Sequence, residues 1–262
     1  MFKFNERSPR GTWIVGHRGA MAHAPENSFA SFKLGLEMGA DFLECDVHLS
    51  KDNQGIVMHD ERLERTTNGR GFIKDFNASD IKKLDAGSWH SKKFKGETVP
   101  LLEELLLWVK EQKSNLGLPV GLVIEIKNDP IRYLNIEDRV LETVHKTGMA
   151  PRVILISFDQ GVVKRAKLLD ATVLTGILYN EPLEDPCYTA RQVAADAIFP
   201  RRNLAFQILV EKAHQQKLFM APWTVNEEKE MQELIRAGVD AMATNFPDRL
   251  NKILSPLYAP TK

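Results

Sequence analysis

The chain has few cysteines and no long apolar run. Of its 262 residues only Cys45 and Cys187 are cysteine, too few for the disulfide framework of a secreted scaffold. No apolar run approaches the roughly 18–20 residues that a membrane-spanning helix needs. The opening MFKFNERSPRG has neither the apolar core nor the cleavage site of a secretory signal. We therefore expect a reduced protein of the cytoplasm.

The chain also lacks an excess of charge of either sign. Lys and Arg together number 35, and so do Asp and Glu, so the formal net charge is zero. Such a balance gives no indication of a nucleic-acid partner or of stable membrane insertion. A hydrophobic fraction of 43% is ordinary for a globular protein. The length matches one α/β barrel, which typically needs about 250 residues.

Strand-like and helix-like segments alternate along the whole chain. Strands are predicted at 12–17, 41–47, 54–60, 120–127, 152–158, 171–179, 196–200, 218–223 and 240–245. Amphipathic helices are predicted at 27–39, with Asn27 as a helix-capping residue, and at 101–113, 135–148, 203–216 and 226–238. This alternation predicts a (β/α)8 TIM barrel, a class of α/β fold. An open doubly wound sheet is the main alternative, weakened by the absence of G-x-G-x-x-G after the first strand.

Two stretches depart from the regular alternation. Nine candidate strands are one more than the barrel needs, and only the turn SKDN separates the strand at 41–49 from the strand at 54–60. A parallel pair needs a longer crossover, so we expect either a hairpin or a barrel distorted near its second and third strands. Residues 61–100 are polar and rich in Gly, Lys and Asp. Their length predicts a small subdomain inserted into a single domain over 1–262.

Acidic residues lie late in two of the predicted strands. Because alternate residues of a strand share a face, Glu44 and Asp46 point the same way and Cys45 points the opposite way. Glu125 lies late in a later strand. Three carboxylates converging on one opening need neutralisation and make an oxygen-rich site, which suits Mg²⁺ or Ca²⁺ better than Zn²⁺. We therefore expect one divalent cation, Mg²⁺ or Ca²⁺, at these acids.

Basic residues and histidines accompany these acids at the strand ends. Arg18 follows the first strand, and Lys127 shares a face with Glu125. Arg can grip a phosphate with two hydrogen bonds, and Lys adds a point charge. His17 and His59 also lie at strand ends, and an unperturbed pKa of about 6.5 suits a histidine to act as acid or base. Barrel active sites lie at this end of the strands, so the set predicts metal-assisted phosphoryl chemistry.

Each of these residues also has a structural explanation. A single histidine at a strand end is more often a hydrogen-bonded structural residue, and Lys127 can simply pair with Glu125. The joint occurrence of all seven residues at strand ends favours the catalytic interpretation. The remaining histidines are interpreted as structural, although one of them, His48, shares a face with Glu44 and Asp46; they are His23, His48, His90, His145 and His214.

At this point the sequence resembles the glycerophosphodiester phosphodiesterases. The resemblance covers nearly the whole chain, in the order of the family's motifs, and its most specific part begins GHRGAMAHAPENSF. The family usually has Thr where this chain has Ser28. The matching stretches are 16–71, 84–106, 124–127 (IEIK), 156–158 (ISF), 223–226 (WTVN) and 244–247 (TNFP).

The resemblance implies a (β/α)8 barrel with a small subdomain inserted after the third strand. It implies hydrolysis of a glycerophosphodiester, a small-molecule substrate, to sn-glycerol 3-phosphate and an alcohol. By position, the acid and base are His17 and His59, the metal ligands Glu44, Asp46 and Glu125, and the phosphate contacts Arg18 and Lys127. Residues that orient the site or line its pocket are Glu26, Asn27, Phe158, Trp223 and Asn245.

The hypothesis that follows is attack of the free glycerol hydroxyl on phosphorus, through a cyclic phosphate that water then opens. Alternatives are a lysophospholipase D-like or phosphoinositide-type phosphodiesterase on the same barrel, a Schiff-base aldolase using Lys127, and a barrel that binds a phosphodiester without catalysis. The sequence leaves open the alcohol that departs, the choice between Mg²⁺ and Ca²⁺, and the oligomeric state.

Overall fold

In a computed structural model that describes residues 7–255, eight parallel strands form the walls of a barrel. Neighbouring strands follow the order β8-β7-β6-β5-β4-β2-β1-β9. The N–H of Asp240 donates to the carbonyl of Met220 (3.0 Å), and that of Ala243 to Pro222 (3.1 Å), so β9 meets β8. The predicted TIM barrel is confirmed in this nearly closed form. Its strands are β1 (Trp13–Gly16), β2 (Phe42–Leu49), β4 (Gly121–Ile126), β5 (Val153–Ser157), β6 (Leu174–Tyr179), β7 (Ala197–Pro200), β8 (Phe219–Met220) and β9 (Ala241–Thr244).

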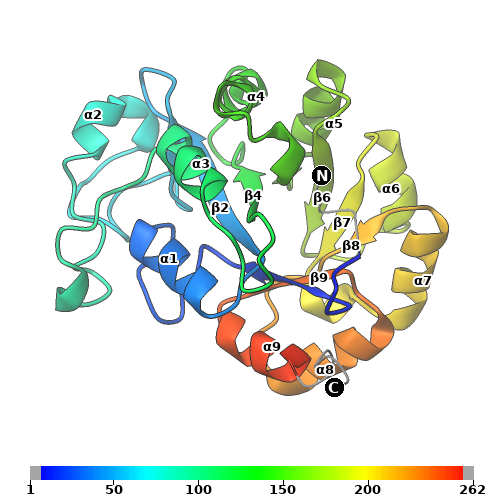
Figure 1. Cartoon of the computed structure of the whole chain (residues 1–262). Helices are drawn as coiled ribbons and strands as arrows, with labels where there is room; N and C mark the ends of the chain where they lie inside the picture. Colours follow the sequence, from blue (N-terminus) through cyan, green and yellow to red (C-terminus); the bar gives the residue numbers. More distant parts are fainter. Residues whose placement is uncertain (1–6, 256–262) are drawn as a thin grey trace.

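Helices surround the strands on the outside (Figure 1). The pattern of α4 shows why: Ile136, Val140 and Val144 recur every four residues and are all buried, which gives the helix one apolar face. Among residues 7–255, no helix is long and apolar enough to span a bilayer. The outer helices are α1 (Phe29–Glu37), α3 (Leu102–Lys110), α4 (Ile136–Thr147), α5 (Gln160–Leu169), α6 (Pro186–Gln192), α7 (Gln207–Gln215), α8 (Glu228–Ala237) and α9 (Pro247–Leu254).

The prediction that Asn27 caps the first helix is wrong. The N-cap of α1 is Ser28, whose Oγ accepts from the N–H of Ser31 at 3.2 Å. Asn27 adopts a left-handed φ of 56° and turns its amide toward Asp46. Asn27, which the sequence indicated as a helix cap, therefore makes a side-chain contact to Asp46 on β2 instead.

The ninth candidate strand, β3 (Gly55–Val57), lies outside the parallel barrel. It pairs antiparallel with β2 in a register that sets Val57 opposite Val47, which confirms the hairpin expectation. The chain then continues back down β2, where the N–H of Met58 donates to the carbonyl of Asp46 at 3.0 Å. The hairpin therefore returns His59 to the level of the acids on β2.

Residues 61–100 lie at one side of the barrel beside β2, in cyan and green in Figure 1. Their short elements are η1 (Ile73–Asp75), α2 (Ala78–Ile81) and η2 (Lys92–Phe94). They bury a small apolar cluster that is separate from the main core and includes Leu63, Ile73, Ile81 and Val99. This segment stands where the insertion was predicted, and the single domain over 1–262 stays a prediction.

Two apolar layers follow from the alternation of side chains along the strands. Val123 and Ile156 point into the barrel interior, together with Trp13 and Phe42, whose rings meet edge to face at 5.6 Å. Cys45 lies in the other layer, between the sheet and the helices. The residues that flank Cys45 therefore face the interior, as predicted.

Gly19 is closely packed against Ser31 in the turn after β1. Its φ is +86°, and a Cβ there would lie 2.4 Å from the backbone carbon of Ser31. We expect Gly19→Ala to lower the free energy of unfolding by about 2–4 kcal/mol, from backbone strain plus overlap. Gly238 is the matched control, since its φ is +84° and nothing lies within 4 Å of a Cβ. Denaturant unfolding measures both; equal losses would contradict the overlap.

Candidate active site

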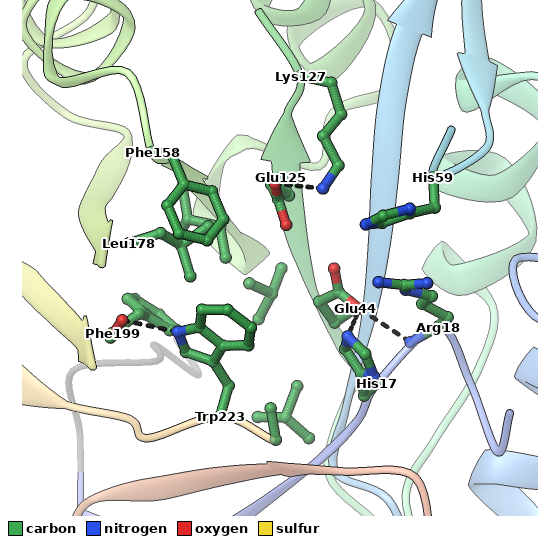
Figure 2. Close-up of a pocket in the computed structure, with 14 residues that line it drawn as sticks. His17, Arg18, Glu44, His59, Glu125, Lys127, Phe158, Leu178, Phe199 and Trp223 are labelled. Atoms are coloured by element: carbon green, nitrogen blue, oxygen red, sulfur yellow. Dashed lines mark hydrogen bonds and ion pairs between the residues drawn. The ribbon is translucent and has the colours of Figure 1, made fainter. Parts of the chain in front are cut away.

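A cavity of about 160 Å³ opens at the carboxyl ends of the barrel strands. Figure 2 shows its two unlike sides. One side is aromatic and aliphatic, with Phe158, Leu178, Phe199 and Trp223. The other side is charged, with His17, Arg18, Glu44, His59, Glu125 and Lys127. A ligand held here would be ionic at one end and less polar at the other.

Three buried carboxylates lie together at this end of the barrel. Asp46 on β2 is in register with Glu125 on β4, and Glu44 lies two residues before Asp46. Ligand oxygens of the three lie within 4.8 Å of one another. Burial and mutual repulsion raise the pKa of Glu44 well above its usual value, and burial raises that of Glu125 to about 7. Such a cluster is stabilised by added positive charge.

Two cations partly supply this charge. Lys127 Nζ lies 3.0 Å from Asp46 Oδ1 and pairs with Glu125, while Arg18 Nε lies 3.2 Å from Asp46 Oδ2. Burial opposes ionisation of Asp46, but Lys127 and Arg18 outweigh it and hold the pKa of this carboxyl well below its usual range. The simple ion pair between Lys127 and Glu125 is therefore present, and both cations also line the cavity.

His17 follows β1 and reaches the cavity with one ring nitrogen engaged behind it. Its Nδ1 lies 2.7 Å from Asn245 Oδ1. Because a carbonyl-type oxygen accepts, Nδ1 carries the hydrogen and Nε2 keeps its lone pair. Nε2 lies 3.9 Å from Glu44 Oε2. Burial and the charge of Arg18 lower the pKa of His17 to about 3, so the neutral form prevails.

His59 is held in a similar way by its neighbour in the sequence. Its Nδ1 lies 2.7 Å from Asp60 Oδ1. Hydrogen bonds from Arg65 lower the pKa of Asp60 to about 2, so this carboxylate accepts and Nδ1 of His59 donates. His48 Nε2 lies 3.0 Å from the carbonyl of His59, and its Nδ1 lies 3.1 Å from Tyr133 Oη. His48 thus supports the backbone of His59, in line with its structural interpretation.

The model of the glycerophosphoryl diester phosphodiesterase family matches residues 17–249, which span both histidines, both cations and all three acids. The chain belongs to this family. A glycerophosphodiester phosphodiesterase of Caldanaerobacter subterraneus subsp. tengcongensis is 36% identical over 239 residues, 91% of this chain and 96% of the relative. The chain is accordingly an enzyme of the phosphodiesterase class.

Solved structures of phosphodiesterases share the barrel. A glycerophosphodiester phosphodiesterase of Agrobacterium tumefaciens is 28% identical with a TM-score of 0.79, over 92% of this chain and 99% of that one. A phosphodiesterase of Oleispira antarctica, solved in complex with the product sn-glycerol-3-phosphate, has a TM-score of 0.81 at 24% identity and covers 93% of this chain and 96% of its own. The second likeness speaks for the fold alone.

In this phosphodiesterase, three residues predicted to orient the site or line its pocket lie behind the wall. Glu26 accepts from Arg18 at 2.9 Å, and Asn27 Nδ2 donates to Asp46 Oδ2 at 2.8 Å. Asn245 bonds to His17. Phe158 and Trp223, by contrast, line the cavity with their rings 5.5 Å apart, edge to face.

Other residues in or near the phosphodiesterase site were not predicted from the sequence. Leu178 and Phe199 lie in the cavity wall, and the alternation along β6 and β7 could have placed them on the inner face. Asp60 could have been predicted, because it directly follows His59 in the sequence. Arg65 contacts Asp60 and Glu26, and nothing in its local sequence indicates this.

A second space of about 320 Å³ adjoins the first. Glu125, Lys127 and Phe158 line both spaces. The new lining is polar and includes Asp129 and Asn180 from the strand ends. The phosphodiesterase thus has a second, polar space beside Glu125 and Lys127.

Proposed function

We propose that the chain hydrolyses glycerophosphodiesters to sn-glycerol 3-phosphate and an alcohol, with a divalent cation. The observation that carries this is the convergence, around one cavity, of two histidines whose Nδ1 atoms are held by Asn245 and Asp60, two cations and an acidic cluster. A diester has a phosphate between two alcohols, and Glu125 and Lys127 line two adjoining spaces that could take them. The Caldanaerobacter relative, a glycerophosphodiester phosphodiesterase that is 36% identical to this chain, supports the same assignment.

Glu44, Asp46 and Glu125 are the residues that would hold the cation. Their oxygens lie within 4.8 Å of one another, and an all-oxygen set suits Mg²⁺ or Ca²⁺. The raised pKa values of Glu44 and Glu125 support this, because both acids gain from a nearby positive charge. When bound, such a cation supplies Lewis-acid polarisation of phosphoryl and hydroxyl oxygens.

Arg18 and Lys127 would bind the phosphoryl oxygens. Both line the cavity and are already anchored on Asp46, so their charged groups are oriented before substrate arrives. Fixed cations in a buried site stabilise the charge that builds up on a five-coordinate phosphorus. Burial alone would lower the pKa of each group, but the neighbouring carboxylates outweigh it and raise both pKa values, so both groups stay protonated.

His17 and His59 would move the protons. One Nε2 removes the proton of the free glycerol hydroxyl, whose oxygen bonds to phosphorus while the bond to the other alcohol oxygen breaks. The second histidine protonates that departing oxygen. This leaves a cyclic phosphate, and water then opens the ring with the two roles reversed. The neutral state of His17 at physiological pH suits it to begin as the base.

The test is release of glycerol 3-phosphate from glycerophosphocholine and glycerophosphoethanolamine. We expect release to stop with chelator and return with Mg²⁺ or Ca²⁺. A substrate analogue without the free glycerol hydroxyl should be inert, because it lacks the internal nucleophile. Normal turnover of that analogue contradicts the cyclic step. No release with any cation contradicts the proposed function and favours a lysophospholipid or phosphoinositide substrate, or binding alone.

A further inference from the structure

Two carboxylates behind the cavity wall each bond to a residue of that wall. Asp60 Oδ1 lies 2.7 Å from His59 Nδ1. Glu26 Oε1 accepts from Arg18 Nη1 at 2.9 Å. Neither carboxylate lines the cavity, whereas His59 and Arg18 do. Asp60 and Glu26 can therefore contact a bound ligand only through those two side chains.

One guanidinium group, that of Arg65, joins these carboxylates. Its Nε and Nη2 donate to the two oxygens of Asp60, at 2.6 and 2.9 Å. Its Nη1 and Nη2 donate to the two oxygens of Glu26, at 2.8 Å each. Both edges of the planar group thus make two-pronged contacts, a geometry that only arginine offers.

The backbone that carries Arg65 is anchored in the 61–100 segment. Leu63 belongs to the apolar cluster of that segment, and Thr66 and Thr67 are buried. The N–H of Thr67 donates to the carbonyl of Leu63 at 3.1 Å. The Arg65 side chain itself is 43% exposed. A firmly held backbone therefore presents a guanidinium that solvent reaches from outside.

We propose that Arg65 is a positioning residue for the phosphodiester reaction: it clamps Asp60 to Glu26 and so fixes His59 relative to Arg18. The inference rests on the proposed function, because it assigns His59 and Arg18 their tasks in that reaction. Arg65 itself touches neither the cavity nor the acidic cluster. It acts from a segment outside the barrel, over two hydrogen-bonded steps.

Loss of the clamp should disturb both partners. Without Arg65, the buried carboxylate of Glu26 keeps the hydrogen bond from Arg18 and draws that guanidinium away from Asp46. Asp60 becomes free to rotate, because Arg65 makes the hydrogen bonds that hold its two oxygens on the far side of His59. The Nδ1–H of His59 then loses its fixed acceptor, and the imidazole loses the orientation of its Nε2.

The first experiment compares Arg65→Ala and Arg65→Lys with the wild type. We expect kcat to fall about 10–100-fold in both, with a smaller rise in KM, because displaced groups cost more in the transition state than in binding. In a His59→Ala background, Arg65→Ala should cost much less than it does alone. Arg62→Ala is the matched control, since Arg62 lies in the same segment but pairs with Glu64 and stacks on Phe72.

A chemical rescue experiment tests whether the guanidinium group of Arg65 is what clamps Asp60 to Glu26. Because the Arg65 side chain is partly exposed, Arg65→Gly should leave an opening that added guanidinium can enter. We expect guanidinium, below concentrations that unfold the protein, to restore part of kcat, and methylammonium to restore less. A residue with a merely structural role would show a lower melting temperature without this selective recovery.

Each outcome decides between the two proposals. If the wild type is active and folded Arg65→Ala and Arg65→Lys keep its kcat and KM, the positioning role is overturned and the function stands. If Arg65→Ala does not fold, full activity in Arg65→Lys overturns the role equally. If the wild type cleaves no diester, the function fails, and the imidazole ¹⁵N signals of His59 then decide: an unchanged Nδ1–H tautomer in the variants overturns the clamp.

Discussion

An Asp46→Asn variant is expected to lose turnover by on the order of 10³-fold or more, since a bound cation contributes several kcal/mol and each 1.36 kcal/mol is tenfold in rate. Asp46 is central because its carboxylate contacts Arg18, Lys127 and the amide of Asn27. Neutralising it weakens the cation site and frees both cations from their shared anchor. The amide keeps the size of the side chain, so the fold should persist.

The measurement pairs kcat at saturating Mg²⁺ or Ca²⁺ with cation affinity from calorimetry. Asp41→Asn is the matched control. Asp41 is equally buried and pairs with Arg10 at 2.6 Å, but it precedes β2 and lies at the opposite end of the strand. We expect this control to lose stability and keep its cation affinity. Wild-type cation affinity and kcat in Asp46→Asn would rule out the proposed cation site.

His17→Ala and His59→Ala are each expected to lower kcat by about 10²–10⁴-fold, the usual contribution of a general acid or base. Each histidine presents Nε2 while its Nδ1 is engaged, by Asn245 or by Asp60. Removing either ring therefore removes a proton carrier that nothing else on the charged wall replaces in the same orientation. Both variants should remain folded, because neither ring belongs to the apolar layers.

A nitrophenyl leaving group separates the two roles. Such a group departs without protonation, so the variant that lacks the general acid should recover most of its activity on this substrate, and the variant that lacks the base should not. His214→Ala is the control, since His214 pairs with Asp240 away from the cavity. Equal recovery of both variants, or of neither, contradicts the division of roles.

Most of the fold could be predicted from two sequence patterns: the alternation of strand-like and helix-like segments along the chain, and the two-residue period of side chains along each strand. The period correctly placed Glu44 and Asp46 inside the barrel and Cys45 outside it, because the layer that a β2 side chain joins depends on its face alone. Strand ends were harder, as at β8, where a predicted 218–223 shortens to Phe219–Met220. Beyond Met220 the chain still bonds to its neighbours, as where the N–H of Trp223 donates to the carbonyl of Pro200 at 3.0 Å, but the regular strand ladder has ended.

The residues of the proposed catalytic set were predictable one at a time, but their connections were not. His59 reaches the acids because the register of the hairpin brings β3 back along β2, a property of pairing rather than of composition. The contact of Arg65 with Glu26 joins residues 39 positions apart. Asn27 was predicted wrongly from its local sequence. It is a good capping residue, but its side-chain amide donates to Asp46 instead. The preference of a residue for a helix cap is overridden where a buried charge nearby needs a hydrogen-bond partner.

The 61–100 segment leaves and rejoins the barrel at neighbouring points, because the N–H of Val57 donates to the carbonyl of Pro100 at 3.0 Å. A loop with adjoining ends can be lengthened, shortened or swapped between homologous enzymes with little strain on the scaffold. Arg65 sets a limit on that freedom. A chimera that exchanges the loop beyond this arginine keeps the clamp, whereas one cut at Val57 must supply a substitute for it.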